Sequence, residues 1–350
     1  MITPPHLKRR ERQSSLELLR IVAILLVLLI HYIQFRGELT PVAARSDVFN
    51  TLGTLSLKSL CIGCVNLFVL ISGYFGIRPK WKSTLRLVSD IAIWVAIALA
   101  ITYIMGDFAN GLSYIADSYM GAFSHWFVVS YLGLCLLSPI LNAWLEKTDD
   151  GTLLKYIAIF YIFSTLFGYL FYAKFHRPVD FNEGMSIMSF VGLYLVGALI
   201  RRNSFLWLRK DKMVYLAVFV GCGVLLVAVA YTALLFGLTV SPYGYINPLV
   251  VIESAALFIF FTKLHMGEIR WINIIAGSAF AVFIFHYVSP CNQYYNQICG
   301  YIQENFNPAL PVALLFLVAI YIFVATVDFF RHKFVSLCRS FISAVRPSRN

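Results

Sequence analysis

Charged residues are scarce in this chain: only 13% of its 350 residues are Asp, Glu, Lys or Arg, whereas 60% are hydrophobic. A soluble domain of this size needs far more charge on its surface. The apolar residues instead form runs of about 20 residues, the length that crosses a bilayer as a helix. The composition therefore excludes a soluble globular protein and predicts an all-α integral membrane protein.

The chain lacks the residues that several other classes of function require. The net charge is +11, yet no soluble segment combines basic residues with stacking aromatics, so we expect no nucleic-acid partner. Cys61 and Cys64 form a CxxC inside an apolar segment without a second such pair, so we expect no metal site. The basic segment before residue 16 leads into a full-length apolar run without a small-residue cleavage site, which indicates no cleavable signal.

Ten apolar segments predict a bundle of about ten transmembrane helices that contacts the lipid bilayer on all sides. Their limits are about 16–35, 57–77, 84–105, 126–145, 153–172, 185–201, 213–236, 248–266, 274–289 and 309–330. If the N-terminus is cytoplasmic, the internal segments hold 22 Lys and Arg residues and the external loops hold four. This bias predicts that both termini are cytoplasmic. A basic N-terminal segment (1–15) then precedes one transmembrane domain (16–330) and a basic tail (331–350).

Two ionisable residues, Arg20 and His31, lie in the first apolar segment, where placing them in a membrane costs free energy. They are eleven residues apart, so on a helix they share one face to within about 20° and are separated by about 16 Å. Glu17 and Gln34 fall on the same stripe. Ionisable groups at membrane depth usually face a cavity or partner helices. The stripe therefore predicts a functional face that runs inward from one membrane surface.

Other ionisable residues are expected near the two ends of this stripe. Glu253 and His286 are expected at the external depth of His31, and Lys82, Arg86 and Asp90 are expected near the cytoplasmic level of Arg20. Simpler roles are open for several of them. Arg20 can reach lipid phosphates or pair with Glu17, Asp90 can pair with Arg86, and a lone buried histidine is commonly a packing residue. Glu253, well inside an apolar segment, needs a partner or a water-filled cavity.

The types of residue at the two ends suit acyl transfer. A neutral imidazole accepts a proton near pH 7, so His31 can deprotonate a hydroxyl nucleophile. The guanidinium of Arg20 can bind phosphate oxygens in pairs. Together they fit a phosphate-bearing acyl donor that reaches into the membrane from the cytoplasm, although the spacing alone also fits a glycan transporter or flippase with a polar translocation path.

Four segments resemble the membrane acyltransferase-3 family, whose members O-acylate bacterial surface polysaccharides and related glycans. Segment 17–31 resembles its Arg-x10-His helix, and 68–74 resembles its Phe-Phe-x-Leu-Ser-Gly-Tyr segment. Segment 126–139 is similar to its Trp-Phe…Tyr…Pro helix, and 278–286 to its Ser-Phe-x-x-Tyr-Leu-x-His segment. The four occur in the family's order along nearly the whole chain.

The resemblance implies an O-acyltransferase in the bacterial inner membrane, a stand-alone form without the extracytoplasmic C-terminal domain of many relatives. It implies that His31 is the catalytic base and that Arg20 lies on the path of acyl-CoA. Arg86 and Lys82 are expected to help hold the phosphates, although Lys82-Ser-Thr-Leu-Arg86 departs from the family's Arg-x-x-Arg element. Glu253 or His286 is expected to orient His31 or to bind sugar hydroxyls.

The expected reaction moves an acetyl or other short acyl group from acyl-CoA to a hydroxyl of a cell-surface or lipid-linked glycan, without a metal. His31 acts as the base, or alternatively forms a transient acyl-histidine. The acceptor sugar, the length of the acyl chain and the oligomeric state are left open. Cys291 and Cys299 fall in one expected external loop, where they form either a disulfide or two free thiols.

Overall fold

A computed structural model describes residues 13–37, 39–78, 81–106, 112–170, 181–238 and 242–345, without the side chains at 81–83, 169, 170, 290 and 338–345. These residues contain no strand, which agrees with the all-helical prediction. The α-helices are α1 (Ser14–Ile33), α2 (Pro41–Ser46), α3 (Val48–Ile62), α4 (Cys64–Phe75), α5 (Trp81–Met105), α6 (Leu112–Ser124), α7 (Trp126–Lys147), α8 (Asp150–Phe163), α10 (Ile187–Arg202), α11 (Lys212–Leu235), α12 (Pro248–Thr262), α13 (Arg270–Ala276), α14 (Ala279–Tyr287), α15 (Ser289–Asn305) and α16 (Ala309–Val345). A π-helix (Ser164–Leu170) and two 3-10 helices (Asn182–Gly184 and Leu206–Arg209) complete them.

Seven helical spans within the described residues are long and apolar enough to cross a membrane. They are Ser14–Ile33, Val48–Phe75, Thr84–Met105, Trp126–Lys147, Asp150–Gly168, Lys212–Leu235 and Ala309–Leu337. The segment Arg270–Tyr287 continues into Cys291–Asn305 after a bend of 82° and adds an eighth span if the pair counts as one. Helices α10 and α12 have 16 and 15 residues and are shorter than a full crossing. A membrane protein with several spans is therefore established, and the number of about ten stays a prediction.

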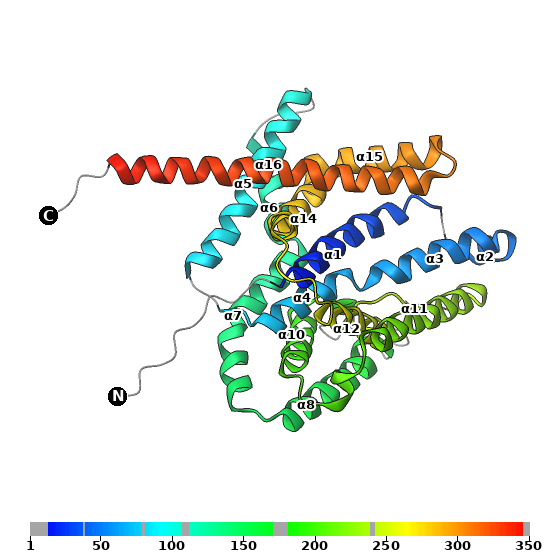
Figure 1. The fold of residues 1–350 in the computed structure, drawn as a ribbon. Coiled ribbons are helices and arrows are strands. Elements are labelled where there is room, and N and C mark those ends of the chain that lie inside the picture. Colours follow the sequence, from blue (N-terminus) through cyan, green and yellow to red (C-terminus); the bar gives the residue numbers. More distant parts are fainter. Residues whose placement is uncertain are drawn as a thin grey trace, which may run out of the picture.

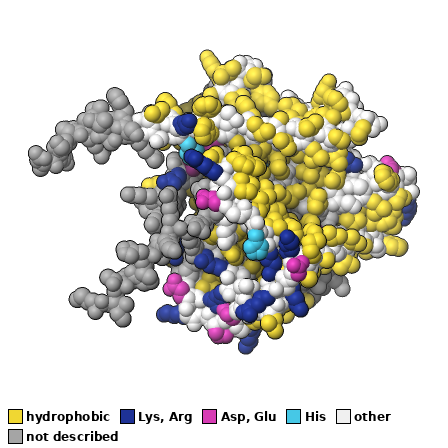
Figure 2. Space-filling model, in the orientation of Figure 1, with side chains coloured by type: hydrophobic (Ala, Val, Ile, Leu, Met, Phe, Trp, Pro, Cys, Tyr) yellow, Lys and Arg dark blue, Asp and Glu magenta, His cyan; other side chains and the backbone are white. Residues whose placement is uncertain are grey.

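Helix α1 begins and α16 ends on the same side of the bundle, at the left in Figure 1. In Figure 2, Lys and Arg side chains gather over the left and lower part of the face in view, and apolar side chains cover the upper and right part. Basic residues concentrate on the cytoplasmic side of membrane proteins. This arrangement is compatible with the predicted cytoplasmic termini, which remain a prediction from the Lys and Arg count.

Helix α1 lies inside the bundle, where it contacts helices from both halves of the chain: α3, α4, α12, α13, α14 and α16 (Figure 1). Leu19 and Leu28 on this helix are fully buried. At its start, Ser14 Oγ donates a hydrogen bond of 2.9 Å to Asn273 Oδ1. Near its other end, the Tyr295 hydroxyl donates to the Leu28 carbonyl at 2.5 Å. Apolar burial and these tertiary hydrogen bonds therefore fix the helix that carries the polar stripe.

Helices α4 and α10 cross with their backbones in contact, and two glycines allow this approach. A Cβ at Gly73 would collide with the Tyr194 carbonyl, and a Cβ at Gly197 would collide with the Leu70 carbonyl. Small residues serve this purpose at helix crossings in membranes. Beside the crossing, the Tyr194 hydroxyl donates to Asn142 Oδ1 at 2.7 Å and accepts from the Ile77 N–H at 2.9 Å. This crossing explains why glycine occupies position 73, next to Ser72.

Gly73→Ala is expected to destabilise the protein by about 1–3 kcal/mol, because the added methyl must push two backbones apart. The measurement is thermal unfolding of the detergent-solubilised protein. Gly221→Ala in α11 is the matched control, since no atom of the described residues lies within 4 Å of a Cβ there. Alanine at that helical position is expected to leave stability unchanged or raise it by up to about 1 kcal/mol. Equal midpoints for the two variants would show that the crossing tolerates a side chain.

The expectation of an external loop around Cys291 and Cys299 is wrong, because these residues lie on α15. Cys291, Tyr295, Cys299 and Ile302 are buried, a helical spacing that a low overall hydropathy conceals. Both cysteines are free thiols. Eight helical residues separate them by about 12 Å, too far for a disulfide between them.

Candidate active site

Helix α1 carries both ends of the polar stripe, with Arg20 near its start and His31 near its end. Arg20 Nη1 donates to the two carboxylate oxygens of Glu17 at 3.2 and 2.9 Å. The local ion pair that the sequence allows is therefore formed. The Arg20 side chain is still 34% exposed, so part of the guanidinium remains available to another anion.

His286 of α14 lies directly against His31. The two ring centroids are 5.2 Å apart and the ring planes are inclined by 47°. His286 is 2% exposed, whereas His31 is exposed. Nδ1 of His286 lies 3.3 Å from the Val282 carbonyl oxygen, so it carries the proton and Nε2 is the acceptor in the neutral ring. The structure thus brings together the two histidines predicted at one depth, and a buried ring of fixed tautomer faces an accessible one.

A third imidazole, that of His125, joins this pair and was absent from the sequence-based site. Its ring lies 5.5 Å from the ring of Phe283 and 4.1 Å from that of Tyr287, both on α14. His31 is close enough to interact electrostatically with both His125 and His286. The sequence could have indicated this residue, because His125 directly precedes the Trp126-Phe127 pair of a family-like segment. Within the described residues, no group of three or more His, Cys, Asp or Glu side chains is arranged to hold a metal ion.

A cavity of about 280 Å³ is lined by Arg20 and by Phe283, whose ring contacts two of the histidines. Its wall includes Arg20 and Val27 of α1, together with Phe127 of α7 and Phe283 of α14. The Phe283 ring also contacts the rings of His125 and His286, at 5.5 and 5.6 Å. The cavity therefore extends from the basic end of the stripe to the aromatic side chains that surround the imidazoles.

One polar pair interrupts the apolar wall of this cavity. The Ser72 hydroxyl donates to the Phe68 carbonyl at 2.9 Å and lies 3.3 Å from the Tyr131 hydroxyl. Ser72 and Tyr131 both line the cavity. A mostly apolar cavity with a few placed polar groups is typical of a small-molecule binding site.

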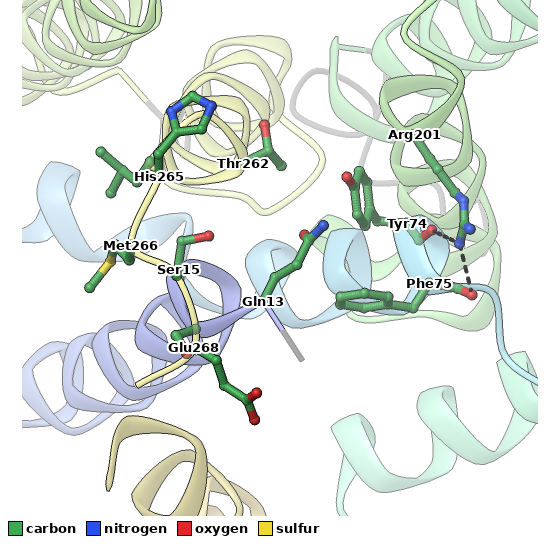
Figure 3. Close-up of a pocket in the computed structure, with 12 residues that line it drawn as sticks. Gln13, Ser15, Tyr74, Phe75, Arg201, Thr262, His265, Met266 and Glu268 are labelled. Carbon is green, nitrogen blue, oxygen red and sulfur yellow. Dashed lines mark hydrogen bonds between the residues drawn. The ribbon is translucent and has the colours of Figure 1, made fainter. Parts of the chain in front are cut away.

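A larger pocket of about 820 Å³ opens on the side where α1 begins (Figure 3). Gln13 and Ser15 border it from α1, Tyr74 and Phe75 from the end of α4, and Arg201 from α10. The α12–α13 connection contributes His265 and Glu268 to the opposite wall. Arg201 Nη1 donates to the Tyr74 and Phe75 carbonyls at 2.9 and 3.3 Å, which fixes the guanidinium at the rim. This pocket combines hydrogen-bonding side chains with two aromatic rings.

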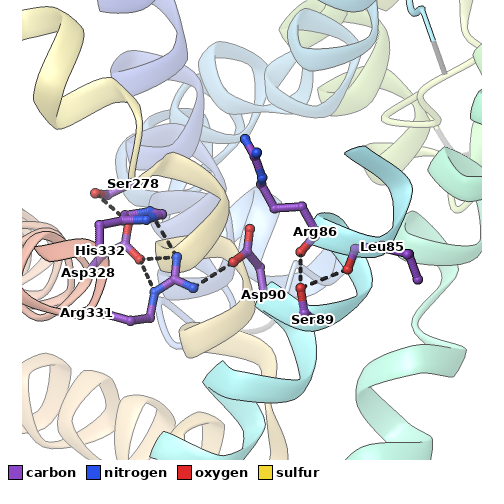
Figure 4. A network of polar contacts seen from close by, with 8 residues as sticks. All are labelled: Leu85, Arg86, Ser89, Asp90, Ser278, Asp328, Arg331 and His332. Carbon is purple, nitrogen blue, oxygen red and sulfur yellow. Dashed lines mark hydrogen bonds and ion pairs between the residues drawn. The ribbon is translucent and has the colours of Figure 1, made fainter. Parts of the chain in front are cut away.

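Asp90 pairs with Arg331 of α16, which corrects the expected pairing of Asp90 with Arg86 (Figure 4). Arg331 donates to Asp90 Oδ1 at 2.6 Å and to Asp328 Oδ1 at 2.8–2.9 Å. The second oxygen of Asp328 accepts from Ser278 at 2.9 Å. The network joins α5, the start of α14, and α16. Helix α16 is continuous through residue 330, so Arg331 belongs structurally to the bundle.

The other two predicted phosphate ligands are less defined. Arg86 is exposed on α5, and its side chain points away from the Asp90–Arg331 pair in Figure 4. Lys82 lies in the first turn of α5, but its side chain is outside the described residues. Both positions lie on the helix that contributes Leu87 to the 280 Å³ cavity.

Glu253 borders a groove that none of the three histidines lines within the described residues. The residue is 2% exposed, and its buried Oε2 has no hydrogen-bond partner among the residues that the structure describes. A groove of about 270 Å³ is bordered by Glu253, by Ser59 of α3 and by Gly223 of α11. A Cβ at Gly223 would lie 3.2 Å from Glu253 Oε1. The structure thus places Glu253 beside α3 and α11 and places His286 beside His31.

Comparison with known proteins identifies one family. The sequence model described as an acyltransferase domain matches residues 13–328, which include every helix from α1 to α15 and most of the apolar part of α16. No curated protein and no solved structure matches the chain significantly.

Proposed function

The chain belongs to the acyltransferase-3 family and is a multi-pass membrane acyltransferase, and from this premise we propose which acyl group it transfers, from where and to what. The donor is acetyl-CoA or another short acyl-CoA. The acceptor is a hydroxyl of a cell-surface or lipid-linked glycan. The membrane is the bacterial inner membrane.

One observation carries this proposal: an accessible imidazole, His31, lies against a buried imidazole of fixed tautomer, His286, near a cavity that also contains Arg20. Since Nε2 of His286 is an acceptor, it can receive a hydrogen bond from one ring nitrogen of His31. The other nitrogen of His31 is then a free acceptor, as a general base requires. A transport path needs no such fixed pair of tautomers.

The donor fits the basic side of the molecule. The 820 Å³ pocket has room, aromatic rings and hydrogen-bonding groups for the nucleotide portion of acyl-CoA. The exposed part of the Arg20 guanidinium supplies charge for a phosphate. Arg86 and Lys82 of α5 are proposed as additional contacts with the phosphates. The elongated pantetheine portion then lies in the 280 Å³ cavity, so that the thioester reaches the histidines.

The reaction requires one proton transfer and one exchange of bonds. His31 accepts the proton of the sugar hydroxyl while the hydroxyl oxygen attacks the thioester carbonyl carbon. The new C–O bond forms and the C–S bond breaks, so that CoA leaves as a thiolate. The imidazolium of His31 then returns its proton to the thiolate, which releases CoA and regenerates the base.

His286 is assigned the role of orienting His31, because the two rings are in contact. Glu253 is proposed to bind hydroxyls of the acceptor sugar, because it borders a groove between α3 and α11. An acyl-histidine route uses the same residues, with a nitrogen of His31 attacking the thioester before the hydroxyl does. The two routes differ in whether label from the donor remains on His31 when no acceptor is present.

The proposed function is tested by comparing surface glycan from wild-type and deletion strains by mass spectrometry. We expect the deletion strain to export glycan in normal amount but without the O-acyl group. Membrane vesicles that contain the full-length protein are expected to transfer radiolabelled acetyl from acetyl-CoA to membrane glycan. Loss of glycan export together with unchanged acylation of the residual glycan would contradict an acyltransferase and favour a transporter.

A further inference from the structure

His125 stands at the N-terminus of α7 with one ring nitrogen already engaged. Its Nδ1 accepts a hydrogen bond of 3.3 Å from the Phe127 backbone N–H. A nitrogen that accepts carries no proton, so in the neutral ring the proton is on Nε2. Within the described residues Nε2 makes no hydrogen bond, and it is not among the buried atoms that lack a partner. His125 therefore presents one accessible N–H donor of fixed tautomer.

The orientation of this ring is fixed by a second contact. The ring of Tyr287 lies 4.1 Å from that of His125, inclined by 31°. The Tyr287 hydroxyl donates to the Ala122 carbonyl at 3.0 Å, which holds the tyrosine against α6. The backbone of α7 and the ring on α14 thus hold the imidazole between them. A donor that is positioned before the reaction needs no reorganisation in the transition state.

The three imidazoles have different hydrogen-bonding capacity. In the proposed function, Nε2 of His286 is an acceptor for His31, and His31 is an acceptor for the nucleophile. Of the three described imidazoles, His125 alone offers a fixed N–H that no described hydrogen bond already engages, since the Nδ1–H of His286 is directed to the Val282 carbonyl. The partial positive charge at the start of α7, a helix of 22 residues, adds to the field at this donor. In the transition state of acyl transfer, negative charge develops on the thioester carbonyl oxygen, which is where such a donor acts.

We infer that His125 is a catalytic residue whose Nε2–H donates a hydrogen bond to the carbonyl oxygen of the acyl-CoA thioester. This inference rests on the proposed function. It adds a second catalytic group, which stabilises the oxyanion, beside the proposed base His31. His125 gains and loses no proton. It stabilises the charge while His31 carries the proton and the C–S bond breaks.

His125→Asn is the decisive variant, because Asn is a strong N-cap residue that replaces the Nδ1 interaction with α7 but has no imidazole N–H. Transfer of labelled acetyl from acetyl-CoA to membrane glycan is measured in vesicles that contain the full-length protein. We expect kcat to fall by about 10²–10³-fold, the usual loss for one oxyanion donor, and KM for acetyl-CoA to change by less than about threefold. His125→Ala is expected to show the same loss of kcat.

A dithioester analogue of acetyl-CoA, with sulfur in place of the carbonyl oxygen, distinguishes charge stabilisation from a structural role. Sulfur is a poor hydrogen-bond acceptor, so His125→Asn is expected to slow this donor by less than about tenfold. Equal losses with both donors, or normal kcat in His125→Asn, overturn the inference while wild-type transfer leaves the proposed function standing. A wild-type protein that transfers neither acetyl from acetyl-CoA nor thioacetyl from the analogue removes both.

Discussion

His31→Ala is expected to reduce acyl transfer by about 10²–10⁴-fold, the contribution of a positioned general base. If His31 instead forms an acyl-histidine, the loss reaches the upper end of that range. The substitution removes an exposed side chain whose ring contacts that of His286. Because the side chain is exposed, we expect the variant to fold. The measurement is the O-acetyl content of surface glycan, determined by mass spectrometry in a strain that expresses the variant at the wild-type level.

His332→Ala provides the matched control, since it removes an imidazole that is 59% exposed and lies near Asp328. This variant is expected to support normal acetylation. Normal O-acetyl content in the His31→Ala strain would eliminate the base and the acyl-histidine alike. The polar stripe on α1 would then serve binding or structure, and the catalytic base would have to be another residue.

The second large effect is expected on stability. Arg331 lies between Asp90 and Asp328, and the side chains of Arg331 and Asp328 are 11% and 2% exposed. Arg331→Ala leaves two carboxylates without their cation, which typically costs about 3–5 kcal/mol for a buried pair. We expect a large fall in the midpoint of thermal unfolding in detergent, or failure of the protein to accumulate.

A double variant separates the ion pairs from the packing of the side chain. Asp90→Asn combined with Arg331→Met removes charge of both signs, and we expect it to be less destabilised than Arg331→Ala. Lys155→Ala changes an exposed cation of α8 and is expected to alter stability by less than about 0.5 kcal/mol. If Arg331→Ala unfolds at the same midpoint temperature as the Lys155→Ala control, the network of Figure 4 contributes nothing to stability.

The sequence predicted best those features that depend on local periodicity. A helical repeat is enough to place Arg20 and His31 on one face of α1, and apolar length is enough to indicate several membrane spans. It also predicted that His286 lies at the depth of His31. It could not predict that the two rings touch, because that contact depends on how α14 packs against α1.

Tertiary partners account for the features that the sequence did not predict. Asp90 had a plausible partner four residues away, but its cation comes from Arg331, which the Lys and Arg count assigned to the tail. Helix α15 was read as a loop because its polar face lowers its mean hydropathy while its buried face is helical. His125 was passed over because its significance lies in contacts with α14, more than 150 residues later in the chain.

The contact between α1 and α14 has a consequence for biosynthesis. Helix α1 leaves the ribosome well before α14, because His286 is translated 255 residues after His31. At about 5–20 residues per second, translation of this interval takes about 10–50 s. During that time the nascent chain carries the proposed base, His31, without the imidazole of His286 that is proposed to orient it, so a chain that stops before α14 lacks part of the proposed catalytic centre. We therefore expect catalytic competence only after α14 has been synthesised and has packed against α1.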